Sequence, residues 1–126
     1  MPAATDLERE ARAMSESDLF KGVAELLKAL GWRYFHIPAT AYKNHGIRSG
    51  FPDITAVRGR WLLFIELKRE KEHLSLEQLE WQADLHRVQD GLKRMAGPSY
   101  EAVRHLVWRP SDLLSGEIAK ILAGGQ

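Results

Sequence analysis

Apolar residues recur along this chain with two different periods, and together they predict a mixture of helices and strands. Ser15–Leu30 places apolar side chains three and four positions apart, as one face of an amphipathic helix requires. Phe51–Val57 and Trp61–Arg69 are short runs rich in branched and aromatic residues, which is typical of strands. Arg58-Gly59-Arg60 separates the two runs as a tight turn. We therefore predict that a helix precedes a central β-hairpin.

The rest of the pattern completes an α/β chain. We predict further strands at Trp32–Ile37 and Ala102–Trp108, a helix that begins after Ser75, and a terminal helix at Ser111–Leu122. Lys93–Tyr100 contains Gly97-Pro98 and breaks the pattern of the helix before it. The expected order is α-β-β-β-α-β-α, a mixed sheet flanked by helices. Residues 1–14 are expected to be a flexible or partly helical lead-in, and residues 15–126 a single domain.

The hairpin brings two acidic residues together if Gly59-Arg60 is its loop, since glycine at the first position favours a two-residue type II′ turn. Asp53 then lies opposite Glu66, with Cβ atoms roughly 4.5–5.5 Å apart. Carboxylates this close repel each other, and a divalent cation between them removes the repulsion. Lys68 points the same way as Glu66, because residues two apart on a strand share a face. The sequence therefore predicts a metal site with a lysine beside it.

Ordinary surface charge is the alternative explanation, because an acid and a lysine two positions apart are common on a solvated face. Leu62–Ile65 argues against it, since four successive apolar residues are typical of a strand covered on both sides. Phe51-Pro52 also restricts the backbone just before Asp53. We favour the metal site for these reasons.

Glu16 and Gln78 are further candidates, each with a structural alternative. Glu16 lies on the same side of its helix as Leu19, from which it can reach the site, but an acid in a first turn also suits the helix dipole. Gln78 follows Ser75 by three positions, where it completes a capping box. It also borders the apolar stripe that we expect to face the sheet.

Two carboxylates and a lysine indicate metal-assisted hydrolysis of a phosphodiester, in which the lysine positions the attacking water or stabilises developing negative charge. Oxygen ligands favour Mg²⁺ or Mn²⁺. The net charge of +1 gives no support of its own to nucleic-acid binding, so local cations carry that prediction. The candidate phosphate contacts are Lys43, Arg48, Arg58, Arg60 and Arg69.

Composition excludes several other classes of site. The chain has no cysteine, so disulfides and zinc–thiolate sites are excluded. No apolar run reaches membrane-spanning length, and the acidic stretch Asp6–Glu10 does not resemble a signal peptide. We expect a cytoplasmic protein that makes no contact with membranes.

Two segments resemble a known motif. Ser49-Gly50-Phe51-Pro52-Asp53 and Phe64-Ile65-Glu66-Leu67-Lys68 resemble the motif of the PD-(D/E)xK nucleases. Leu74–Gln78 and Trp108–Asp112 extend the likeness to the VRR-NUC branch, especially to small stand-alone members from phages and bacteria. The resemblance implies a restriction-endonuclease-like core. It implies that Asp53 and Glu66 are metal ligands together with the backbone carbonyl of Leu67, that Lys68 is the catalytic lysine, and that Glu16 and Gln78 are the helix acid and the family glutamine.

The resemblance also implies a substrate and an assembly. Small members resemble Holliday-junction resolvases, which act on DNA as homodimers. We expect a Mg²⁺- or Mn²⁺-dependent endonuclease for branched or structured DNA, acting in a bacterial or phage-infected cell. A flap-trimming, repair or restriction-type nuclease with the same site is one alternative, and a non-catalytic DNA-binding module is another. Lys93–Tyr100 departs from the compact family pattern.

Overall fold

The computed structural model describes residues 5–38 and 50–124. Their elements are α1 (Asp6–Ala13), α2 (Glu16–Ala29), β1 (Arg33–His36), β2 (Ile54–Arg58), β3 (Trp61–Leu67), α4 (Leu76–Ala96), β4 (Val103–Trp108), α5 (Pro110–Leu114) and α6 (Glu117–Gly124). The predicted α/β class is confirmed, as are the four strands in their expected order. Residues 39–49, which include the predicted phosphate contacts Lys43 and Arg48, lie outside the described residues.

The four strands form one mixed sheet in the order β1-β2-β3-β4. β1, β2 and β3 pair antiparallel, whereas β4 pairs parallel to β3. In the hairpin, Arg58 pairs with Trp61, so Gly59-Arg60 is the two-residue loop that the sequence predicts. Gly59 has a φ of 58° and Arg60 has no positive φ, as a type II′ turn requires.

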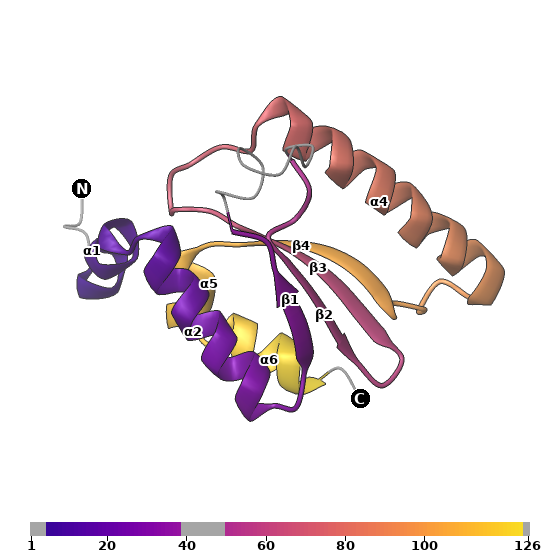
Figure 1. Ribbon diagram of the computed structural model, residues 1–126, viewed down its shortest axis with the longest axis horizontal. Coiled ribbons are helices and arrows are strands. Elements are labelled where there is room, and N and C mark those ends of the chain that lie inside the picture. Colours follow the sequence, from indigo (N-terminus) through magenta and orange to yellow (C-terminus); the bar gives the residue numbers. More distant parts are fainter. Residues whose placement is uncertain (1–4, 39–49, 125–126) are drawn as a thin grey trace.

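Helices cover the sheet on both faces, which places the predicted helices in two layers (Figure 1). α2 and α6 bury their apolar stripes against one face, where the fully buried residues include Leu19, Leu27, Ile54, Ile65 and Ile118. α4 crosses the other face and contributes no buried residue. The mixed sheet flanked by helices agrees with the predicted restriction-endonuclease-like class.

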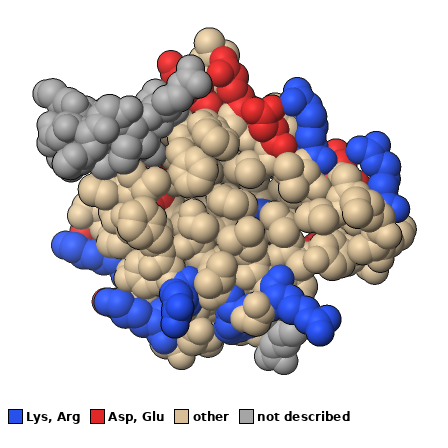
Figure 2. Space-filling model, turned by 45° about the vertical axis from the view of Figure 1, so that its right-hand side comes forward, with Lys and Arg blue, Asp and Glu red and all other residues tan. Residues whose placement is uncertain are grey.

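Much of the α4 side of the sheet is open to solvent. Phe35 on β1 is 66% exposed and Val57 on β2 is 40% exposed, whereas α4 lies over β4. Figure 2 shows a broad surface with few charged side chains, with basic groups along the lower edge and both acidic and basic groups along the upper edge.

Three element boundaries differ from the sequence-based prediction. The lead-in contains α1, which begins with a capping box between Thr5 and Glu8 and packs beside α5. α4 continues one turn beyond the expected break and ends at Gly97, whose φ of 111° few other residues adopt. The terminal helix is interrupted at Gly116, with a φ of 85°, and is therefore divided into α5 and α6.

Candidate active site

The hairpin register brings Asp53 and Glu66 together, as predicted. Ile54 pairs with Ile65, and one further step of the same register puts Asp53 opposite Glu66. The two side chains are close enough to form a hydrogen bond. Asp53 is also held by its neighbours, because its Oδ2 accepts a hydrogen bond of 2.7 Å from the Leu67 N–H and its carbonyl accepts one of 2.9 Å from Ile37. Its carboxylate is therefore fixed at the end of the sheet.

The residues before Asp53 are wedged between the sheet and α4. Gly50 has a φ of 93°, and a Cβ at this position would lie 2.6 Å from the backbone of Glu77. The Phe51 ring packs edge-on against Trp81, with ring centroids 4.9 Å apart, and also contacts Phe64. Glycine at position 50 thus allows the close approach of α4 that positions the acidic pair.

Glu66 is a buried acid, with 1% of its surface exposed. Burial is the main reason that its pKa rises from 4.5 to about 9, and the hydrogen bond and negative charge of Asp53 act in the same direction. Lys68 lowers the pKa but does not offset these effects. The pair of acids therefore favours either a shared proton or a bound cation.

Gln78 connects α4 to this pair. It both completes the capping box and faces the acids, the two roles considered for it from the sequence. Its Oε1 accepts a hydrogen bond of 2.8 Å from the Ser75 N–H, which completes the capping box. Its Nε2 donates to Glu66 Oε1 over 3.0 Å. Because the amide oxygen accepts the capping hydrogen bond, the amide NH₂ is oriented toward Glu66.

Lys68 follows on the same face of the strand and is 7% exposed. Its backbone N–H donates to the Trp108 carbonyl over 3.1 Å, which anchors this residue beside the end of β4. The Lys68 charge lowers the pKa values of Glu16, Glu66 and Glu72, so its ammonium group lies among these acids. The predicted acid–acid–lysine arrangement is present in the fold.

Glu16 also reaches this cluster, from the first turn of α2. Its pKa rises from 4.5 to about 6, mainly because of partial burial and then because of the adjacent Glu72 carboxylate, with a smaller contribution from Asp53. Ser15 caps the helix by accepting a hydrogen bond of 3.0 Å from the Asp18 N–H. Glu16 is therefore free of the capping role and faces the site.

Two residues near the site were missed by the sequence analysis. Glu72 forms a side-chain hydrogen bond with Glu16 and accepts one of 3.2 Å from the Arg69 N–H. His36 ends β1, stacks on Phe20 with ring centroids 3.9 Å apart, and has its pKa lowered by burial despite the opposing charge of Asp53. Neither residue belongs to a spacing pattern that marks it as functional. Their positions follow from how a loop and an edge strand pack.

The segment after Lys68 is tied to the last part of the chain. Arg109 Nη2 donates to the Glu72 carbonyl over 2.9 Å, and Glu70 Oε1 accepts a hydrogen bond of 3.0 Å from the Ser111 N–H. Arg109 also precedes α5, where its backbone N–H donates to Asp112 over 2.8 Å. The Trp108–Asp112 motif therefore holds the loop that carries Glu72.

The predicted phosphate contacts are not all near the acids. Lys43 and Arg48 lie outside the described residues, whereas Arg69 directly follows Lys68. Arg58 and Arg60 lie at the hairpin turn, about 16 Å from Asp53 along the strand. Arg58 donates to the Leu30 carbonyl at the end of α2 over 2.9 Å and lies over the Trp32 ring. This contact gives Arg58 a structural role.

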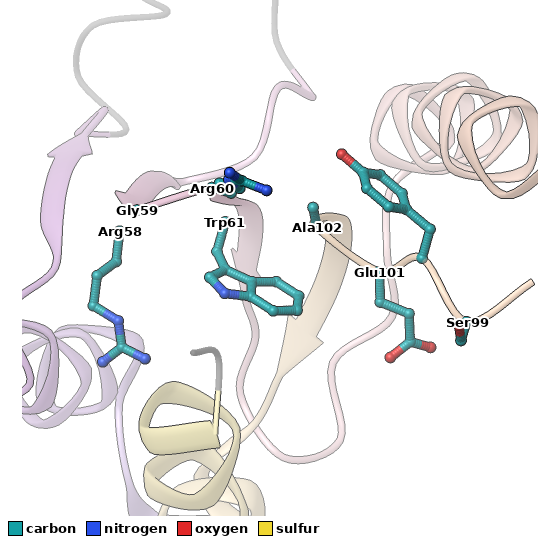
Figure 3. Close-up of a pocket in the computed structure, with 8 residues that line it drawn as sticks. Arg58, Gly59, Arg60, Trp61, Ser99, Glu101 and Ala102 are labelled. Atoms are coloured by element: carbon teal, nitrogen blue, oxygen red, sulfur yellow. The ribbon is translucent and has the colours of Figure 1, made fainter. Parts of the chain in front are cut away.

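A cavity of about 580 Å³ also lies at the hairpin turn, away from the acidic cluster. Arg58, Trp61 and Glu101 are among the residues that line it, and the Arg58 guanidinium extends toward α2 (Figure 3). The residues that line this cavity are charged and aromatic but include no pair of acids. The cavity is therefore a weaker candidate for a hydrolytic site than the Asp53–Glu66 pair.

The donor set at the acidic pair fits a hard divalent cation. Asp53 and Glu66 present adjacent carboxylates, and the Leu67 backbone adjoins both. Across residues 5–38 and 50–124, no group of three or more His, Cys, Asp or Glu side chains is arranged to hold a metal ion. An ion held by these two carboxylates would therefore need water and the Leu67 carbonyl to complete its ligand shell. Mg²⁺ is commonly bound in this way, through one or two carboxylates and several retained waters.

Comparison with known proteins gives a fold-level likeness. No family model matches the sequence, and no curated protein matches it. A solved structure described as a VRR_NUC domain is similar, with 20% sequence identity and a TM-score of 0.49, over 83% of this chain and 96% of that chain.

The helices of the described residues include none that is long and apolar enough to cross a membrane.

Proposed function

We propose that this chain is a Mg²⁺- or Mn²⁺-dependent DNA endonuclease of the VRR-NUC type. One observation carries the proposal: a buried glutamate and an aspartate are held side by side at the end of the sheet, with a buried lysine among the neighbouring acids. A purely structural role does not call for this arrangement, because two carboxylates this close, one of them buried, stay together only with a shared proton or a bound cation. Hydrolysis of a phosphodiester uses all three side chains.

Asp53, Glu66 and the Leu67 carbonyl would hold the cation. When bound, such an ion lowers the pKa of a coordinated water and offsets charge on the phosphate. Asp53 is kept in place by the Leu67 N–H, and Glu66 by the Gln78 amide. These two hydrogen bonds fix the direction of each carboxylate before substrate arrives.

Lys68 has the role of orienting the attacking water or of stabilising the negative charge that develops on the phosphate. Its burial supports this role, since a charge acts more strongly where water is scarce. Glu16 lies at the edge of the cluster with a pKa of about 6, which suits a group that exchanges a proton near neutral pH. Gln78 acts through Glu66 as a positioning residue.

Branched or structured DNA is the substrate that we favour, with two copies of the chain each cutting one strand. Single-subunit sequence reading has little support because the net charge is only +1. A two-fold dimer would double the basic footprint and match the symmetry of a four-way junction.

The test is incubation of the purified chain with labelled four-way junction, flap, nicked and linear duplex, in Mg²⁺, Mn²⁺ or EDTA. We expect cutting that requires a divalent ion, with the junction cut fastest. Lys68→Met and Asp53→Asn should each lower cutting by at least 100-fold. Preference for the flap or the linear duplex would instead support a repair or restriction-type nuclease.

A non-catalytic DNA-binding module is the other candidate. It predicts that DNA is bound but not cut with any ion, that calorimetry detects no binding of Mn²⁺, and that Asp53→Asn leaves DNA affinity unchanged. Those three results together would replace the nuclease proposal.

A further inference from the structure

A hollow beside the candidate active site is bordered by cationic side chains that the proposed chemistry does not use. Its volume is about 320 Å³, and its lining consists of Arg12, Arg69, Glu70, Lys71 and Glu72. Glu72 belongs to both features, because it also hydrogen-bonds Glu16 and lies within the field of Lys68. The hollow therefore opens directly alongside the acidic cluster.

The N-terminal helix forms one wall of this hollow. α1 ends with Arg12 in its last turn and is anchored through Ala11, which is 2% exposed. Arg69 Nη2 donates to the backbone carbonyl of Arg12 over 3.5 Å, which links α1 to the segment after Lys68. Because this contact uses the Arg12 carbonyl, the Arg12 guanidinium remains exposed to solvent.

The acids of the hollow are engaged by backbone amides. Glu70 accepts a hydrogen bond from Ser111, and Glu72 accepts one from Arg69. Both acids keep their place in the lining, and the charge of Arg69 helps to lower the pKa of Glu72. Within the described residues, the ion pairs involve Arg9, Arg87 and Lys93, so none of the three cations of the hollow is paired with a carboxylate. The lining thus carries three cations and two carboxylates, a net charge of +1, on a concave surface next to the site.

This arrangement differs from that of the basic residues at the hairpin turn. The Arg58 guanidinium is committed to Leu30 and Trp32, about 16 Å along the strand from Asp53. Arg12 and Lys71 have no such structural commitment and lie at the catalytic end of the sheet. A DNA strand bound at the acidic cluster would therefore pass closer to these two cations than to Arg58 and Arg60.

We propose that Arg12, Arg69 and Lys71 bind the sugar–phosphate backbone of the DNA strand next to the phosphate that is cut. α1 thereby becomes a substrate-binding element. This inference rests on the proposed nuclease function for the identity of its ligand. Contacts of this kind position the strand without reading its sequence, and each makes binding more sensitive to salt.

The test is binding of fluorescein-labelled DNA in EDTA, followed by anisotropy over a range of salt concentrations. The variant is Arg12→Gln with Lys71→Gln, and the matched control is Lys28→Gln with Lys120→Gln, which removes two exposed lysines from α2 and α6. We expect the first pair to weaken binding at least tenfold and to reduce the slope of log affinity against log salt by about two. The control pair should change neither quantity, and both proteins should unfold at the wild-type midpoint.

Equal affinity and slope for the variant and wild type would overturn the inference, as would an equal loss in the control. Wild-type protein that binds no DNA would also overturn it. Because the assay requires no cutting, its outcome is independent of catalysis. If the wild type cuts DNA and the variant binds DNA as tightly as the wild type does, the proposed surface is wrong and the nuclease function stands. If the variant binds DNA more weakly but the wild type never cuts, the surface stands and the nuclease function is wrong.

Discussion

Glu66 links the stability of the protein to pH. Its pKa is about 9 in the folded chain, against an ordinary value of 4.5, because the carboxyl is buried beside Asp53. The folded state therefore holds this proton more tightly than the unfolded state does. Stability from this group is complete below pH 4.5 and is lost as the pH rises toward 9.

In metal-free protein, we expect the free energy of unfolding in urea to fall between pH 7 and 9, and Glu66→Gln to remove most of that fall. This window avoids the other shifted groups, since Glu16 has a pKa of about 6 and His105 one of about 4. Glu80→Gln, on the exposed surface of α4, should retain the wild-type slope. A wild-type curve that is flat across this window would contradict the assigned environment of Glu66.

Gln78 has two contacts that substitution can separate. Gln78→Glu keeps an acceptor for the capping box but loses the NH₂ that binds Glu66. We expect cutting to fall about 10- to 100-fold, as the loss of a hydrogen bond to a charged group predicts. Ser75→Ala is the complementary variant, and it should cost about 1 kcal/mol of stability while leaving most activity. Wild-type cutting by Gln78→Glu would show that the Glu66 contact is unimportant.

The residues that could be predicted are those fixed by local geometry. Asp53 and Glu66 follow from a two-residue turn, and Lys68 from the period of two along a strand. Glu72 could not be predicted, because its contact with Glu16 depends on how a loop packs beside α2. The sequence also does not show that the guanidinium of Arg58, a predicted phosphate contact, donates to the Leu30 carbonyl at the end of α2.

At the scale of elements, the approach of α4 to the Asp53 segment depends on Gly50. Alanine at either Gly50 or Gly31 has to adopt a positive φ, which costs about 1–2 kcal/mol. Only at position 50 would the added methyl also meet the Glu77 backbone, at 2.6 Å. We expect urea unfolding to show a larger loss of stability for Gly50→Ala than for Gly31→Ala, and only Gly50→Ala to reduce cutting. Equal losses would show that the contact with α4 is not tight.

Element type was predictable from apolar period, but several ends were not. α4 was expected to stop near Lys93, whereas it continues to Ala96 because the segment contains no residue that prevents a helix before Gly97. α1 has few apolar residues, so it offers little apolar surface from which a helix could be predicted. Its capping box and its contacts with α5 account for the helix, and the second of these is a tertiary effect.

At the scale of the whole molecule, the sheet order and the two helical layers decide which cations can serve the active site. Composition gave no guidance here, because a net charge of +1 averages over both ends of the sheet. The fold separates Arg58 and Arg60 at the hairpin turn from Arg12, Arg69 and Lys71 beside the acids. This separation could not be predicted, since Arg12 approaches the site only through the packing of α1.

Metal binding should stabilise the whole domain. A cation that binds only the folded state adds about 2.7 kcal/mol at a concentration 100 times its Kd. We expect thermal melting to shift upward by several degrees in excess Mn²⁺ and to return to its starting value with EDTA. Asp53→Asn keeps an acceptor for the Leu67 N–H but should lose the shift. The same shift in this variant would place the ion elsewhere.

The proposed hydrolysis requires that Asp53 and Glu66 share a divalent ion. An anomalous difference map from crystals soaked in Mn²⁺ tests it directly. We expect a strong peak between the two carboxylates, about 2.1 Å from one oxygen of each and close to the Leu67 carbonyl. Carboxylates that remain hydrogen-bonded to each other with no peak between them, or a peak at a different group of residues, would contradict it.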